Sequence, residues 1–213
     1  MTAQETLAGI AEAVSVCTKC ALHHSRKHGV PGEGPPNAEI MFIGEGPGFH
    51  ENEQGRPFVG AAGQLLDSLL AGAGLNRAEV WITNVVKCRP PANRDPLPEE
   101  IDVCTRSYLD AQLRLINPPI IVTLGRISMG KYLPGAKIGD VHGQMRRVGD
   151  RHVIAMYHPA AALRQPSLKP VLEADFARLP ALLKQARLAH EKMGAQPRTA
   201  GPEPDDPKQL SMF

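Results

Sequence analysis

Four cysteines are the residues of this chain whose type and spacing most directly indicate chemistry. Cys17 and Cys20 form a Cys-x-x-Cys pair, and Cys88 and Cys104 follow far downstream with fifteen residues between them. All four belong to one pattern, and no further cysteine is left over. Four thiolates can hold a [4Fe–4S] cluster or a tetrahedral zinc ion, and the spacing alone leaves both open.

The N-terminal sequence indicates the compartment in which these thiols act. The first six residues, Met-Thr-Ala-Gln-Glu-Thr, are polar and include an acid, unlike a secretory signal. No apolar run approaches the roughly 20 residues that a membrane span needs. We therefore expect a cytoplasmic protein, where thiols stay reduced and grouped cysteines indicate metal binding rather than disulfides.

A glycine-rich loop, Gly-Glu-Gly-Pro-Gly at residues 44–48, is the second chemical feature. It does not match the dinucleotide-binding pattern Gly-x-Gly-x-x-Gly, because Phe49 stands at the third glycine position. It also lacks the Gly-Lys-Ser/Thr of a phosphate-binding P-loop. The glycines are therefore predicted to let the backbone approach a flat or anionic ligand, with a purely structural turn as the alternative.

These residues must be positioned by secondary structure, and the hydrophobic pattern predicts an α/β protein. Four apolar or β-branched runs lack polar alternation, as do strands buried on both faces: residues 40–43, 80–86, 120–124 and 153–157. Helical patterns separate or follow them at residues 63–75, 97–116 and 171–190, with a short helix after Gly125. We predict a three-layer α/β/α fold with a central, mainly parallel four-stranded sheet.

The chemically interesting residues follow the predicted strands. The glycine loop follows the first strand, Asn84 lies at the end of the second, Gly125 follows the third and His158 follows the fourth. In open α/β sheets, ligands bind beyond the carboxyl ends of the strands. The sequence therefore predicts one active site at this edge of the sheet.

Composition fits one soluble domain followed by a tail. The chain has 213 residues, of which 42% are hydrophobic and 22% charged, and a net charge of only +2. Its overall charge thus gives no indication of a nucleic-acid partner. Residues 193–213 are rich in Gly and Pro and poor in core-forming side chains. We predict a domain over residues 1–192 and a flexible tail over residues 193–213.

Separated motifs resemble family 4 uracil-DNA glycosylases. They are Gly-Glu-Gly-Pro-Gly at 44–48, Gly-Arg-Pro-Phe-Val-Gly at 55–60, Thr-Asn-Val-Val-Lys-Cys-Arg-Pro-Pro at 83–91 and His-Pro at 158–159. The resemblance extends from about residue 17 to residue 164. It implies a [4Fe–4S] cluster, rather than zinc, on Cys17, Cys20, Cys88 and Cys104.

The resemblance also implies roles in binding a uracil that has been flipped out of DNA. Phe58 would stack on the base; a core side chain is the alternative. Asn84 carries one acceptor and two donors, which suit the N3–H and O4 edge of uracil, although a satisfied buried Asn is the alternative. His158 resembles the histidine of this superfamily that donates to uracil O2.

Other residues are implied to line the site. Glu45 is the predicted carboxylate that orients water or stabilises a cationic sugar, and Gly46 is predicted to contact the substrate. Glu51 would lie near uracil C5 and exclude the thymine methyl group, and Asn93 would line the sugar side. The chain departs from the acidic run usual in this region at three positions, Phe49, His50 and Asn52.

The activity implied is that of a monofunctional DNA-repair glycosylase, which hydrolyses the N-glycosidic bond of uracil and leaves an abasic site. One alternative is the related family that binds uracil-DNA covalently, but that family uses a histidine in the loop after the third cysteine, and residues 89–100 contain none. The others are a non-catalytic iron–sulfur module that binds DNA or carries electrons, and a zinc-stabilised nucleotide-binding protein.

The C-terminal residues resemble a peptide that binds the bacterial sliding clamp. The sequence Gln209-Leu210-Ser211-Met212-Phe213 offers one hydrogen-bonding side chain, while Leu210, Met212 and Phe213 would fill an apolar groove. Its position at the end of a predicted tether suits docking, although chance is a real alternative for so short a motif. We expect the protein itself to be a monomer.

Overall fold

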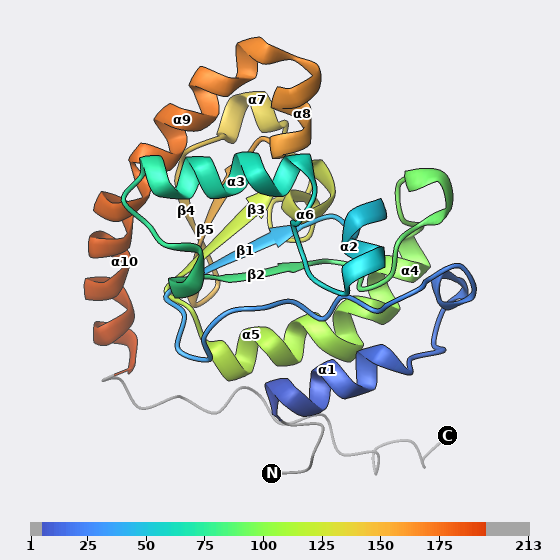
Figure 1. The fold of residues 1–213 in the computed structure, drawn as a ribbon. Coiled ribbons are helices and arrows are strands. Elements are labelled where there is room, and N and C mark those ends of the chain that lie inside the picture. The colour runs from blue at the N-terminus through green and yellow to red at the C-terminus, as the bar shows by residue number, and fades with distance from the viewer. Residues whose placement is uncertain (1–5, 195–213) are drawn as a thin grey trace, which may run out of the picture.

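A central five-stranded sheet organises the computed structural model, which describes residues 6–194 (Figure 1). The strand order is β2-β1-β3-β5-β4. The strands are β1 (Ile40–Gly44), β2 (Trp81–Asn84), β3 (Ile120–Leu124), β4 (Met145–Val148) and β5 (Arg151–Met156). Strands β2, β1, β3 and β5 pair in parallel, and β4 pairs antiparallel with β5.

The α/β class and the mainly parallel sheet are confirmed, but the sheet has one strand more than the four predicted. The four predicted strands are β1, β2, β3 and β5, and all residues of β1, β2 and β3 are buried. The additional strand, β4, reads Met-Arg-Arg-Val and lies at the sheet edge with exposed arginines. It lacks the apolar run on which the prediction depended, and a hairpin through Gly149 joins it to β5.

The helices lie between and after the strands. The α-helices are α1 (Leu7–Ser15), α2 (Phe49–Gln54), α3 (Ala61–Gly72), α4 (Pro98–Cys104), α5 (Asp110–Ile116), α6 (Arg126–Gly130), α7 (Ile138–Val141), α8 (Pro159–Arg164), α9 (Lys169–Ala177) and α10 (Leu179–Gly194). Short 3₁₀ segments occur at Ala21–His24, Arg77–Glu79, Pro91–Asn93 and Pro166–Leu168.

Two predicted helices are each divided. The helix predicted over residues 97–116 contains a π-helical turn, Thr105–Leu109, directly after Cys104. The helix predicted over residues 171–190 consists of α9 and α10, with Arg178 between them. Pro180 is the second residue of α10, a position that tolerates a missing backbone N–H but does not continue a preceding helix.

Alternating strand residues build a core on each face of the sheet. In β1, Phe42 belongs to one cluster and stacks on Phe176 of α9, with ring centroids 5.8 Å apart. Met41 and Ile43 belong to the opposite cluster, with Leu109 before α5. Figure 1 shows α3 and α9 on one side of the sheet and α1 and α5 on the other. The three-layer prediction is therefore confirmed.

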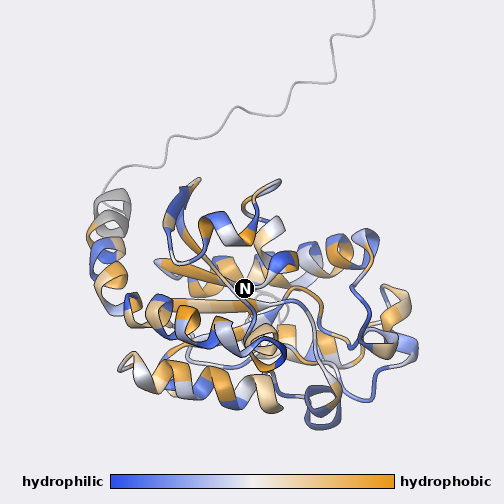
Figure 2. Ribbon diagram, turned by 90° about the horizontal axis from the view of Figure 1, so that it is seen from above, coloured by the Kyte–Doolittle hydropathy of each residue, from blue (hydrophilic) through white to orange (hydrophobic). Residues whose placement is uncertain are grey.

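Hydropathy follows the same layers. Figure 2 shows the central strands coloured as hydrophobic, while the surrounding helices alternate between hydrophobic and hydrophilic residues. Such alternation is typical of helices with one buried face. Within residues 6–194, no helix has the length and apolar character needed to cross a membrane.

The predicted domain boundary at residue 192 lies within α10, which continues to Gly194. The rest of the predicted tail, including the predicted clamp-binding peptide at residues 209–213, lies outside the described residues. Its docking stays a prediction from the sequence.

Candidate active site

A cavity of about 350 Å³ lies beyond the carboxyl ends of the parallel strands. Register places these ends level: Gly44 of β1 pairs with Asn84 of β2, and Leu124 of β3 pairs with Met156 of β5. All predicted site residues other than the cysteines line this one cavity, namely Glu45, Gly46, Glu51, Phe58, Asn84, Asn93 and His158. Its volume is in the range of small-molecule sites.

Asn84 presents an unpaired acceptor to the cavity. Its side chain is 1% exposed, and its Oδ1 has no hydrogen-bond partner in the described structure. A buried carbonyl without a partner costs about 1–3 kcal/mol, so this oxygen is expected to serve a ligand N–H. Gly44 makes room for it: a Cβ there would lie 2.4 Å from Asn84 Oδ1 and 2.7 Å from Phe58 Cζ.

His158 is held as a neutral hydrogen-bond donor. It caps α8, and its Nδ1 accepts the N–H of Ala160 at 3.1 Å. Since Nδ1 accepts, the proton of the neutral ring resides on Nε2. Burial lowers the pKa of His158 to about 4, with the charge of Arg164 acting in the same direction. The imidazole is therefore neutral at pH 7 and donates from Nε2.

Phe58 forms an aromatic wall of the cavity. Its side chain is 6% exposed, and its ring stacks near His158 with centroids 5.5 Å apart and planes at 24°. Its backbone has a φ of 50°, a left-handed conformation that a phenylalanine seldom adopts. Neighbouring contacts must therefore hold this segment in place.

Arg77 provides one of those contacts. Its guanidinium donates to the carbonyl oxygens of Pro57 at 2.6 Å and Phe58 at 3.2 Å. Glu33 and Asp67 pair with the same guanidinium at 2.7 and 2.8 Å. Its charge is thus balanced while its fork binds the strained backbone.

Glu51 holds the Phe58 segment from the other side. Its Oε1 accepts the N–H groups of Val59 and Gly60 at 2.9 Å, and its Oε2 accepts the N–H of Gly48 at 3.1 Å. The carboxylate thereby ties the glycine loop to the segment that carries Phe58. The predicted contact of Glu51 with a base near C5 stays a prediction.

Glu45 is a half-buried carboxyl group in the cavity wall. Burial raises its pKa, the charge of Asp95 raises it further, and Arg126 and Arg164 oppose the rise. Arg126 lines the cavity and pairs with Asp95 at 2.5 Å, and both side chains are exposed. A carboxylate with a raised pKa can hold a water molecule and accept its proton.

Asn93 lies at the outer edge of the cavity. Ala92 and Asn93 both have left-handed backbone conformations, with φ of 52° and 54°. The side-chain oxygen of Asn93 accepts Arg89 Nε at 2.8 Å. This contact fixes the amide on the loop that follows Cys88.

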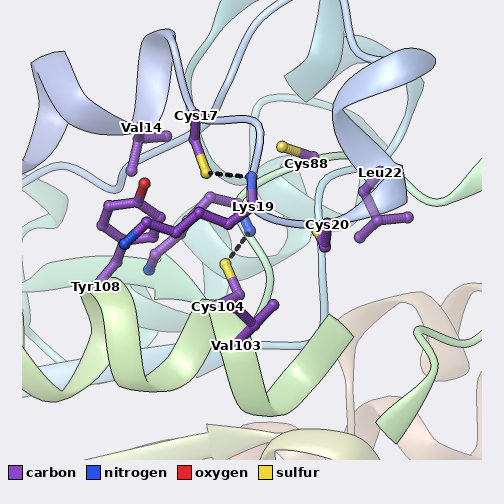
Figure 3. Close-up of a pocket in the computed structure, with 10 residues that line it drawn as sticks. Val14, Cys17, Lys19, Cys20, Leu22, Cys88, Val103, Cys104 and Tyr108 are labelled. Carbon is purple, nitrogen blue, oxygen red and sulfur yellow. Dashed lines mark hydrogen bonds between the residues drawn. The ribbon is translucent and has the colours of Figure 1, made fainter. Parts of the chain in front are cut away.

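The four cysteines line a second cavity, adjacent to β2 (Figure 3). Cys17 follows α1, Cys20 precedes a 3₁₀ turn, Cys88 follows β2 and Cys104 ends α4. The backbone N–H of Lys19 donates to Cys17 Sγ at 3.5 Å, and that of Lys87 donates to Cys104 Sγ at 3.3 Å. All four cysteines are free thiols.

The cysteine cavity is largely apolar. Besides the cysteines, its wall consists of Val14, Leu22, Val103 and Tyr108, with two lysines, Lys19 and Lys87. Burial raises the pKa of Cys20, Cys88 and Cys104, the last to about 11. Among the described residues, no three His, Cys, Asp or Glu side chains are arranged closely enough to hold one metal ion.

Lys87 connects the two cavities. It is 1% exposed, lines the cysteine cavity, and donates from Nζ to Thr83 Oγ1, the Asn84 carbonyl oxygen and Gln112 Oε1 at 2.6, 2.9 and 2.8 Å. Burial lowers its pKa to about 8. Lys87 belongs to the motif at residues 83–91, but the sequence does not predict these contacts.

Sequence reasoning missed Arg77 and Arg94. Arg77 lies in a 3₁₀ turn between α3 and β2, far in sequence from the Phe58 backbone that it contacts, and no local pattern indicates that contact. Arg94 lines the cavity and pairs with buried Glu100 at 2.8 Å. The available signal for Arg94 was its own position as the single basic residue between the Arg-Pro-Pro motif and Cys104.

An unpaired amide oxygen, a fixed aromatic ring and a neutral imidazole donor together suit a flat heterocycle with polar edges. The site therefore defines an enzyme that recognises a nucleobase at the carboxyl edge of an α/β sheet. A family model described as the uracil DNA glycosylase superfamily matches residues 31–179. The chain belongs to this superfamily.

Curated relatives within this superfamily include type-4 and type-5 uracil-DNA glycosylases. It is 48% identical over 187 residues to a type-4 uracil-DNA glycosylase of Sulfurisphaera tokodaii, covering 82% of this chain and 84% of the relative. It is 46% identical over 184 residues to that of Archaeoglobus fulgidus, covering 82% and 92%. A type-5 enzyme of Thermus thermophilus is 35% identical over 150 residues, covering 61% and 68%.

Replacing Arg77 by Lys should weaken binding of free uracil, measured by NMR titration, by about tenfold, because a lysine cannot bind both carbonyl oxygens with a planar fork. Arg56→Lys is the matched control: Arg56 pairs with the same Glu33, at 2.8 Å. Equal weakening in both variants would contradict a specific effect on Phe58.

The ring protons of His158 should titrate near pH 4 in NMR spectra, because burial opposes the charged form. The unfolded chain binds this proton near pH 6.5, so the contribution of His158 to stability is present above that pH and declines as pH falls toward 4. A midpoint near 6.5 in the folded protein would contradict the buried, neutral state.

Proposed function

We propose that this chain excises uracil from DNA by hydrolysing the N-glycosidic bond, leaving an abasic site. The observation that carries the proposal is the unpaired Oδ1 of buried Asn84, which faces a cavity also lined by Phe58 and His158. Membership of the uracil DNA glycosylase superfamily and the identity to type-4 enzymes support the same activity.

Base selection follows from the polarity of the Asn84 amide. Its oxygen accepts the N3–H of uracil, and its NH₂ group donates to O4. Cytosine presents an unprotonated N3 and an amino group at the corresponding edge, so the fixed amide would meet donor with donor and acceptor with acceptor. Phe58 stacks on the base, a contact of about 1–3 kcal/mol in comparable sites.

Bond cleavage places the bonding electron pair on the departing uracil. His158 donates from Nε2 to uracil O2, where much of this negative charge resides, and so stabilises the leaving group. Water attacks C1′ of the cationic sugar, and its proton passes to the Glu45 carboxylate. The raised pKa of Glu45 makes it a better base for this step.

Glu51 and Asn93 complete the proposed site. Glu51 is bound to three backbone N–H groups, so it positions the glycine loop and Phe58, and from there we propose that it excludes the thymine methyl group. Gly46 brings backbone close to the base, where a Cβ would lie 2.8 Å from a Val86 methyl group. Asn93 would contact the sugar from the cavity edge.

We propose that Cys17, Cys20, Cys88 and Cys104 hold a [4Fe–4S] cluster. The donor set fits: four free thiols from three segments (the loop with Cys17 and Cys20, the loop after β2, and α4) line one cavity, and backbone N–H groups donate to two of the sulfurs. When bound, the cluster supplies a covalent cross-link and the positive charge that stabilises buried thiolates. It would join the segment after α1 to β2 and α4.

Two further proposals rest on the sequence. We propose a cytoplasmic location, and docking to a sliding clamp through Gln209, Leu210, Met212 and Phe213. The covalent uracil-DNA binder is the closest alternative activity, and the absence of histidine from residues 89–100 argues against it.

Excision can be tested with an end-labelled oligonucleotide that contains one uracil and is cleaved by alkali at abasic sites. The wild type should turn over many times, and His158→Ala should lower kcat by about 10²- to 10³-fold through loss of the donor to O2. Asn84→Ala should be similarly impaired. An adduct stable to denaturant without turnover would instead identify a covalent binder.

Cys88→Ser should lower both iron content and solubility, measured by elemental analysis and sedimentation, because one ligand of the cluster is lost. Val16→Ala is a suitable control, since this residue is 72% exposed and directly precedes Cys17. A soluble, active Cys88→Ser protein with full iron content would contradict the cluster assignment.

A further inference from the structure

Phe49 is an exposed aromatic side chain beside the nucleobase cavity. Six large hydrophobic side chains are exposed among the described residues, and Phe49, at 54%, is the aromatic one. Phe49 belongs to none of the three hydrophobic core clusters among the described residues. Its ring therefore contributes little to folding, although an aromatic ring offers a large apolar area for contact.

The ring is placed at the cavity rim by its neighbours. Phe49 begins α2 directly after Gly48, and Gly48 lines the cavity. Arg89, on the loop after Cys88, lies with Cζ 5.3 Å from the centroid of the Phe49 ring. Arg89 in turn donates to Asn93, which also lines the cavity. The pair thus joins two loops that both contribute residues to the cavity wall.

A planar guanidinium over an aromatic ring is a surface that suits a nucleobase. Both groups stack on bases, and such contacts accept every base because each has a π-face. The ring of His50 meets that of Phe49 nearly perpendicularly, at 83°, and Phe49 stays more than half exposed despite both contacts. Ring area therefore remains available to a ligand.

The charge around the rim suits DNA. Arg94, Arg126 and Arg164 line the same cavity; Arg94 also pairs with Glu100, and Arg126 pairs with Asp95. When one nucleotide of a DNA strand enters the cavity, the adjacent nucleotides stay at the rim, where these cations can approach their phosphates. A neighbouring base that has lost its stacking partner through flipping exposes an apolar face.

We propose that Phe49, with Arg89 behind it, is a stacking subsite for the base adjacent to the flipped uracil in the same DNA strand. This inference rests on the proposed glycosylase function. In this proposal Phe49 binds the DNA strand beside the uracil, whereas Asn84 and Phe58 bind the uracil itself. The subsite accepts any base and favours an unpaired neighbour, which is free to leave its own stack.

The test is a cycle between a protein variant and a substrate variant. The substrates are a single-stranded oligonucleotide with one uracil, and two versions in which a stable abasic linker replaces the nucleotide on the 5′ or the 3′ side. On the intact strand, Phe49→Ala should lower kcat/KM by about five- to hundredfold, the range expected for one base stack. Phe49→Trp should retain activity, since a larger ring can stack equally well.

On one of the two linker substrates, the kcat/KM of the wild type should fall to the value that Phe49→Ala has on the intact strand. The kcat/KM of Phe49→Ala should be the same on that linker substrate as on the intact strand. Leu188→Ala is the matched control, because Leu188 is 58% exposed on α10, far from α2 in Figure 1. It should behave as wild type on all three substrates.

Two results would overturn the subsite. One is a kcat/KM of Phe49→Ala equal to that of the wild type on the intact strand. The other is a kcat/KM that Phe49→Ala lowers by the same factor, relative to the wild type, on all three substrates. Either result leaves the glycosylase function standing if the wild type excises uracil. If the wild type does not excise uracil from the intact strand, the proposed function itself fails.

Discussion

The hydrogen bonds of the buried Lys87 side chain and backbone link the nucleobase cavity to the cysteine cavity, and the geometry of both cavities depends on them. A buried charge requires hydrogen-bond partners, and Nζ has three, one of which is the backbone carbonyl of Asn84. The same residue donates its backbone N–H to Cys104 and lines the cysteine cavity. The end of β2 is therefore held between the cysteines and the amide that faces the nucleobase cavity, so that order in one cavity supports geometry in the other.

The nucleobase cavity is preformed, and several contacts maintain it. Phe58 adopts a left-handed backbone conformation, with Arg77 bound to its carbonyl oxygen and Glu51 bound to the two following N–H groups. Gly44 leaves the space that the ring and the Asn84 amide occupy. Preorganised groups need little rearrangement during reaction, and this is the main way in which fixed dipoles lower a barrier.

The electrostatic character of the molecule is local rather than global. A net charge of +2 gives little long-range attraction to DNA, yet three arginines line one cavity. Two of them are paired with carboxylates, Arg94 with Glu100 and Arg126 with Asp95. These pairs reduce the net positive charge at the cavity, so the exposed apolar surface at Phe49 is the feature beside it that best suits a nucleobase.

The sequence by itself determined the buried strands, the order of the motifs and the placement of reactive residues after strand ends, because burial leaves a local hydrophobic pattern. The same reasoning missed β4, whose Arg146 and Arg147 are exposed at the sheet edge and leave no such pattern. It also missed Arg77, which is nineteen residues from Phe58 along the chain. Only the tertiary structure decided these contacts, since a hydrogen bond depends on distance in space, and no local periodicity records which distant side chain will satisfy a strained backbone.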